Sequence, residues 1–184
     1  MKGTATMKTL TIALTTACFA VTLSFAQADP APLNPHLEPL RPLLDKTWKG
    51  VFKDSKPDKP TVDVARWERA LNGQAVRMLH SVNDGVYGGE TLFIWDAKKN
   101  CVVYYYFTTA GYMTTGTMET KGGKMVSHEE VQGEAGGVTA VRSTDELLPN
   151  GKLHVKAEYC KNGQWTPGHE ITYEPDSSAQ PVFK

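Results

Sequence analysis

From Thr47 to Tyr173 the chain repeats one pattern about ten times: alternating apolar and polar residues, then a turn rich in Gly, Asn or Asp. Alternation with a period of two predicts strands that bury one face and expose the other. Turns of a few residues predict antiparallel neighbours. The pattern therefore predicts an all-β fold, an antiparallel up-and-down barrel of about ten strands.

Short turn sequences separate the predicted strands, and a polar loop is expected at 55–60. Asn72-Gly73 is one of the strongest hairpin signals and predicts a type I′ turn with positive φ at Gly73. We expect strands over residues 48–53, 62–71, 74–82, 90–96, 101–109, 112–120, 125–132, 138–147, 153–160 and 165–173.

A short helical segment is predicted ahead of the strands. Prolines at 39 and 42 limit it to a turn or two, and its leucines share one helical face. These leucines are Leu37, Leu40, Leu43 and Leu44. We expect the segment to plug one end of the barrel. The predicted organisation is a Pro-rich leader over 29–35, a barrel domain over 36–175 and a polar tail over 176–184.

Residues 1–28 have the pattern of an export signal. A positively charged start and an apolar stretch precede Ala26-Gln27-Ala28, a small-x-small cleavage site. The apolar stretch is interrupted by Thr and Ser and is shorter than the roughly 20 residues that span a membrane. We expect cleavage after Ala28, a periplasmic or secreted protein, and no membrane partner once the signal is removed.

Charge and cysteine content exclude some partners and leave one pairing open. The chain has 20 Lys and Arg against 20 Asp and Glu, without a basic cluster, so nucleic acid is not an expected partner. After the signal, Cys101 and Cys160 are the remaining cysteines. An oxidising compartment favours a disulfide, but these residues lie on predicted strands that are not neighbours, so their pairing stays open.

Several motifs resemble a known family. Leu40-x-x-Leu43-Leu44-x-x-Thr47-Trp48-x-Gly50 is similar to the leucine-rich turn and first strand of lipocalin-like (calycin) barrels. Arg66-Trp67 with Leu71-Asn72-Gly73, and the segments 88–96 and 106–111, resemble the bacterial family called domain of unknown function 1579. The resemblance covers about Leu37 to Tyr173. It implies a lipocalin-like barrel and no known activity.

The same barrels are distantly similar to nitrobindin-like haem barrels, which implies haem as an alternative cofactor. Those proteins ligate iron through a histidine on a late strand, within a segment of the type HLxAxLxR that this chain lacks. His169 is the late-strand histidine here, and its surroundings, Pro167-Gly168-His169-Glu170-Ile171, do not match. A hydrogen-bonded or solvent-facing histidine is the simpler interpretation, and no cofactor is predicted.

Strand alternation also selects candidate cavity residues. We expect the cavity to be lined by Trp67, Met78, His80, Phe93, Trp95, Tyr105 and Phe107. In the run Tyr104-Tyr105-Tyr106-Phe107 both faces of the strand are aromatic, so Tyr104 and Tyr106 are the alternative pair of cavity residues. A slip of one residue would exchange the two faces of the strand.

Polar candidates for the cavity are Arg66, Arg69 and Glu90. An inward arginine could pair with a ligand carboxylate, whereas the alternative is a solvated outer face with Trp67 inside. His80 shares an apolar face with Met78, and a buried imidazole needs hydrogen-bond partners. The expected partners are Arg66, Glu68, Arg69 and Glu90.

Recognisable catalytic motifs are lacking. There is no G-x-S-x-G motif, and the histidines and cysteines lack the spacing of a metal site. Glu129 and Glu130 are adjacent on a predicted strand, so they face opposite sides and cannot act as a pair.

Three functions are therefore considered. The first is an exported carrier or sensor that binds a small apolar or amphipathic molecule in the barrel. The second is an enzyme that uses the same cavity, with His80 as a base or His169 as a haem ligand. The third is an interaction module, including a homodimer, that uses an outer aromatic face. The lack of a catalytic motif favours binding over catalysis.

Overall fold

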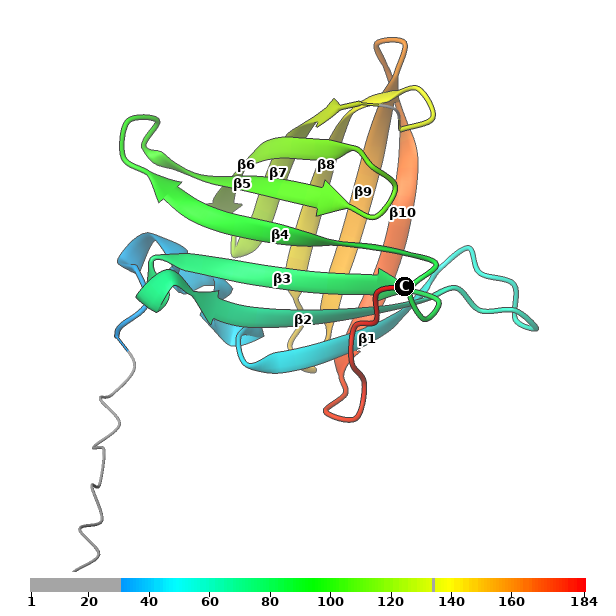
Figure 1. Cartoon of the computed structure of the whole chain (residues 1–184), viewed down its shortest axis with the longest axis horizontal. Coiled ribbons are helices and arrows are strands. Elements are labelled where there is room, and N and C mark those ends of the chain that lie inside the picture. The colour runs from blue at the N-terminus through cyan, green and yellow to red at the C-terminus, as the bar shows by residue number, and fades with distance from the viewer. Residues whose placement is uncertain (1–30, 134) are drawn as a thin grey trace, which may run out of the picture.

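The computed structural model describes residues 31–133 and 135–184, so the predicted export signal and its cleavage site lie outside the described residues. Ten strands form one closed barrel in which sequence neighbours pair antiparallel and β1 also pairs with β10 (Figure 1). The expected all-β barrel is confirmed. Its strands are β1 (Lys46–Phe52), β2 (Val62–Ala70), β3 (Ala75–Val82), β4 (Tyr87–Asp96), β5 (Cys101–Thr108), β6 (Met113–Lys121), β7 (Lys124–Gln132), β8 (Val138–Leu147), β9 (Leu153–Lys161) and β10 (Gln164–Pro175).

A 3-10 helix, η1 (Pro35–Leu43), closes one end of the barrel (Figure 1). Asn34 caps it by accepting a hydrogen bond from the His36 backbone N–H at 3.0 Å. The leucines of the predicted apolar face are buried against a core that includes Trp48, Trp67 and Phe93. The indole of Trp48 also donates to the Leu43 carbonyl at 3.1 Å. The predicted plug is thus present, and we call this end of the barrel the plug end.

The turn between β2 and β3 differs from the predicted two-residue hairpin. The strands stop at the pair Ala70–Ala75, and a four-residue loop joins them, most of it a short 3-10 turn, η2 (Leu71–Gly73). The predicted positive φ of Gly73 is confirmed at 83°. The leader packs on this loop, and the Asn34 N–H donates to the Gly73 carbonyl at 2.8 Å.

The C-terminal segment lies on the outside of the barrel. It leaves β10 and crosses β1 and β2 toward β3 (Figure 1). The Asp176 N–H donates to the Thr47 carbonyl, and the Val182 N–H donates to the Ser81 hydroxyl at 2.9 Å.

Two further observations concern the cysteines, whose pairing was open, and membrane-spanning helices. Cys101 and Cys160 are free thiols, because they lie on β5 and β9, which do not pair. Within residues 31–133 and 135–184, no helix is both long and apolar enough to cross a membrane.

Candidate functional site

The barrel encloses a cavity of about 570 Å³ whose wall receives side chains from β1 to β10. The wall is layered along the barrel axis. Near the plug end it is apolar and aromatic, with Trp48, Trp67, Phe93, Met118, Met125 and Leu153. At the opposite end lie Phe52, Val82, Tyr87, Tyr112, Val131 and Val138. The wall also carries polar residues, which we call the polar girdle: Asp63, His80, Thr91, Tyr106, Thr114, Ser127, Glu129, Ser143 and Asp145.

Four of the predicted cavity residues lie in this wall: Trp67, Met78, His80 and Phe93. Trp67 and Phe93 stack with their ring centroids 5.4 Å apart. The assignment of Trp95 to the cavity wall is wrong. Trp95 shares the inward face of β4 with Phe93 but lies beyond the cavity, where its ring stacks on His36 of the plug at 3.6 Å. Whether the four wall residues bind a ligand stays a prediction.

The assignment of Tyr105 and Phe107 to the cavity is wrong. Their side chains are on the outside of β5, 42% and 51% exposed, whereas Tyr104 and Tyr106 line the cavity. The reason lies in the neighbouring strands. A Cβ atom on Gly116 would lie 2.4 Å from the Tyr104 ring, and one on Gly89 would lie 2.4 Å from the Tyr106 ring. Glycines in β6 and β4 thus make room for two inward phenol rings.

The assignment of Arg66, Arg69 and Glu90 as polar cavity residues is also wrong. Arg66 and Glu90 project from the outer face, where Arg66 pairs with Glu68 at 2.7 Å. Arg77 continues this outer network, 2.6 Å from Glu68 and 4.0 Å from Glu90. Hydrogen bonds from Arg77 and Arg66 lower the pKa of the Glu68 carboxyl. Strand alternation explains the placement, since Trp67 takes the inward position between Arg66 and Glu68.

Arg69 lies on the inward side of β2 but past the floor of the cavity. Its guanidinium reaches the β2–β3 turn, where a Cβ on Gly73 would lie 2.9 Å from it. It is therefore next to the leader rather than next to a ligand.

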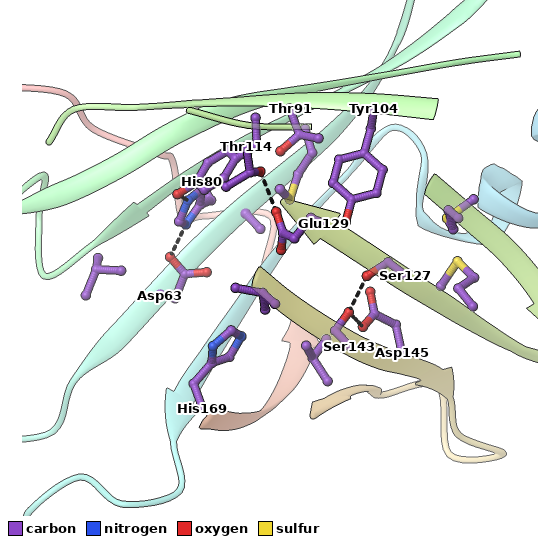
Figure 2. A pocket seen from close by; sticks show the side chains of 18 of the residues that line it. Asp63, His80, Thr91, Tyr104, Thr114, Ser127, Glu129, Ser143, Asp145 and His169 are labelled. Carbon is purple, nitrogen blue, oxygen red and sulfur yellow. Dashed lines mark hydrogen bonds and ion pairs between the residues drawn. The ribbon is translucent and has the colours of Figure 1, made fainter. Parts of the chain in front are cut away.

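His80 makes two hydrogen bonds, and neither is to an expected partner. Its Nδ1 lies 2.9 Å from Asp63 Oδ1 (Figure 2). Its Nε2 lies 2.7 Å from the Tyr106 hydroxyl. The other carboxylate oxygen of Asp63 accepts from the Tyr173 hydroxyl at 2.6 Å. Because both ring nitrogens are engaged, His80 has no free nitrogen with which to act directly on a ligand as a base.

A chain of phenols extends this cluster to the far end of the cavity. The Tyr106 hydroxyl lies 2.8 Å from that of Tyr87, which lies 2.7 Å from that of Tyr112. Burial raises the pKa of both Tyr87 and Tyr106. The two phenols therefore stay protonated over the physiological range.

Glu129 and Asp145 are two acidic wall residues that the sequence pattern did not predict (Figure 2). Glu129 accepts a hydrogen bond from the Thr114 hydroxyl. Asp145 accepts one from the Ser143 hydroxyl at 3.0 Å. Burial raises the pKa of Glu129 and raises that of Asp145 to about 6. Both faces of β7 and β8 carry polar residues, so alternation alone gave no signal for them.

His169 lies in the cavity wall rather than on the outer surface. Its Nδ1 is 2.6 Å from the Tyr159 hydroxyl, and its ring meets Phe52 edge to face. Burial lowers the pKa of the imidazole, which favours the neutral form. The interpretation of His169 as a hydrogen-bonded residue agrees with this geometry, and that of a solvent-facing residue does not.

The cavity wall as a whole is rich in acidic groups. It carries three carboxyl groups and two imidazoles, and none of the described residues that line it is a Lys or Arg. Among residues 31–133 and 135–184, no group of three or more His, Cys, Asp or Glu side chains is placed to hold a metal ion.

Comparison with known proteins gives the fold alone. No family model and no curated protein matches the chain. A solved structure does match, the "Crystal Structure of Rv2717c from M. tuberculosis", with a TM-score of 0.57 and 15% sequence identity. The match covers 78% of this chain and 99% of that chain. At this identity the similarity establishes a shared barrel architecture, and the resemblance to domain of unknown function 1579 stays a prediction.

Proposed function

We propose that this protein is an exported barrel that binds a small amphipathic or apolar molecule in its cavity. The observation that carries the proposal is the enclosed space of about 570 Å³, closed by η1 at the plug end. Small-molecule sites typically occupy roughly 300–1,000 Å³ and are mostly apolar, with a few placed polar groups. The layered wall has this composition, since an aromatic floor adjoins a polar girdle.

Several polar groups of the girdle are held by hydrogen bonds to one another. Asp63 and Tyr106 both bond to His80, and Thr114 bonds to Glu129. Buried polar groups that satisfy one another keep their positions, which lowers the cost of ordering a site on binding. The arrangement therefore favours a preformed pocket for a molecule with one polar end and one apolar end.

A cavity-filling pair of variants tests the location of the site. Val155 lines the cavity, whereas the adjacent Lys156 is exposed on the outside of β9. We expect Val155→Trp to weaken binding of the neutral dye Nile red by at least about tenfold, and Lys156→Trp to leave binding unchanged. Circular dichroism checks that both variants fold. Equal dye binding by the two folded variants would place the dye outside the barrel.

Export is part of the proposal and is tested separately. It is supported by the pattern that ends at Ala26-Gln27-Ala28. The protein recovered from the periplasm or medium should have the intact mass of a chain that starts at Asp29. Retention of the full-length mass in that fraction would contradict cleavage at this site.

Haem is a second candidate ligand, supported by one specific observation. His169 is held through Nδ1 by Tyr159, and no protein hydrogen bond within the described residues engages its Nε2. A fixed, neutral imidazole with one free nitrogen fits an axial haem ligand. Addition of haem should then give a Soret band that His169→Ala removes and that His154→Ala, a variant outside the cavity wall, leaves intact. A spectrum unaffected by His169→Ala would exclude this role for His169.

A further inference from the structure

We infer that the cavity selects a ligand with a positively charged amine, which binds Glu129 or Asp145 while its apolar part lies on the aromatic floor. This inference rests on the proposed function, because it concerns the same cavity. It specifies the chemical class of the ligand, which neither the barrel fold nor the solved structural relative indicates.

The charge of the wall is the first argument. Both carboxylate oxygens of Asp63 have partners within the protein, since they bond to His80 and Tyr173. Glu129 and Asp145 each accept a single hydroxyl hydrogen bond within the described part of the chain. A carboxylate offers about four lone-pair sites, so both groups keep acceptor capacity. The lining residues include no Lys or Arg that could use it.

The register of β7 and β8 places the two carboxyl groups on the same pair of strands, on either side of a pair of serines. Ser127 is paired with Ser143, and these two residues lie between Glu129 and Asp145 along the strand pair. The serine hydroxyls bond to each other at 2.8 Å (Figure 2). The negative charge of Asp145 contributes to the raised pKa of Glu129, so the two groups interact. An ammonium group, with three N–H donors, can bond to either carboxyl group and is attracted by the charge of the other.

A second, independent feature also points to a ligand. Thr91 is 3% exposed, lines the same cavity and is labelled among the girdle residues in Figure 2. Its hydroxyl makes no hydrogen bond to another described residue, whereas the hydroxyls of Thr114, Ser127 and Ser143 do. Within the described residues no fully buried polar side-chain atom lacks a partner, so the Thr91 hydroxyl is open to the cavity and is available to bond a ligand there.

Electrostatics then separates the ligand classes. A carboxylate or phosphate ligand would meet acidic groups and no guanidinium or ammonium, which disfavours its transfer from water. A neutral alcohol could form hydrogen bonds but would leave the carboxyl groups without a counter-charge. A cationic amine gains charge-assisted hydrogen bonds, which are roughly twice as strong as neutral ones. The apolar layer near Phe93 and Met125 accommodates its hydrocarbon part.

Three probes that differ only in their head group test the inference. Octylamine, octanol and octanoate are titrated against protein loaded with Nile red, and the displacement midpoints are compared at pH 7.5. We expect octylamine to bind at least about tenfold tighter than octanol, and octanoate to bind weakest. As pH rises from 5 to 7.5 the affinity for octylamine should increase, because the carboxyl groups ionise, while the affinity for octanol stays constant.

Adjacent residues supply matched controls for the amine site. Glu129→Gln and Asp145→Asn should each weaken the preference for octylamine, and the two changes combined should abolish it, without affecting the binding of Nile red. Glu130→Gln and Glu146→Gln alter neighbouring carboxyl groups that are not in the cavity wall, so they should preserve the preference. Nile red binding serves as the check that every variant is folded.

Two results would overturn the inference, and they differ in their meaning. Equal displacement by octylamine and octanol, or a preference that survives the two changes combined, would refute amine selectivity and leave the ligand-binding barrel in place. Failure of Nile red and of all three probes to bind the folded protein would refute the proposed function itself, and the inference with it.

Discussion

Asp63 and His80 lie on the paired strands β2 and β3, and their side chains join across the inside of the barrel at 2.9 Å. The same carboxylate accepts a hydrogen bond from Tyr173 on β10, and Asp63 is 2% exposed. One buried carboxyl group thus links three strands. It also fixes the end of the hydrogen-bond chain that continues through Tyr106.

Removal of this carboxyl group should destabilise the barrel. Asp63→Ala leaves the His80 imidazole and the Tyr173 hydroxyl without their acceptor, so we expect the free energy of unfolding to fall by about 3 kcal/mol. Urea denaturation followed by fluorescence measures the change. Asp58→Ala, in the exposed loop before β2, is the control and should have little effect. A loss below about 0.5 kcal/mol for Asp63→Ala would contradict the structural role.

The raised pKa of Asp145 predicts a pH-dependent stability effect. The folded barrel binds this proton more tightly than the unfolded chain, so stability falls as pH rises from about 4 to the folded pKa of about 6. Asp145→Asn removes that loss. We expect the variant to gain up to about 2–3 kcal/mol over the wild type at pH 7.5, and to gain nothing near pH 4.

Denaturation of both proteins at several pH values measures this difference. Glu146→Gln alters the adjacent carboxyl group, which pairs with Lys124 at 2.8 Å on the outside, and should give no such pH-dependent gain. A difference between Asp145→Asn and wild type that is the same at pH 4 and 7.5 would mean that Asp145 does not titrate as described.

The two faces of β5 should respond differently to truncation. Tyr104 is 5% exposed and fills the space beside Gly116, so Tyr104→Ala should cost about 3–5 kcal/mol. Tyr105 is exposed, so Tyr105→Ala should cost under about 1 kcal/mol. Thermal or urea denaturation distinguishes the two. The opposite order would show that the inside and outside of β5 are exchanged.

The β2–β3 turn allows conformational strain to be separated from packing. Gly73 and Gly122 both have positive φ, at 83° and 58°. Each Gly→Ala change should therefore cost about 1 kcal/mol for the backbone conformation. An added Cβ at Gly73 would also lie 2.3 Å from the Pro32 carbonyl, whereas Gly122 has open space. Gly73→Ala should thus cost at least about 1 kcal/mol more than Gly122→Ala. Equal melting temperatures would show that the leader does not pack on this turn.

The sequence determined the elements of this protein because each depends on local regularities. Period-two alternation with Gly- and Asn-containing turns specified ten antiparallel strands, and the spacing of Leu37, Leu40 and Leu43 specified the plug. Alternation also placed Met78 and Phe93 in the wall, because the apolar face was clear on those strands. The backbone period alone was enough at these positions.

Only the tertiary structure decided which face points inward on strands whose two faces are alike, and which polar side chains meet. On β5 both faces are aromatic, and Gly89 and Gly116 on other strands made room for Tyr106 and Tyr104 inside. His80 bonds to Asp63, which lies diagonally across from it on β2, and the sequence of β3 alone does not predict this contact. Glu129 and Asp145 point into the cavity because of the register of β7 and β8, two strands that carry polar residues on both faces. Side-chain direction on such strands is set by the space and partners that neighbouring strands provide, which lie far away in sequence.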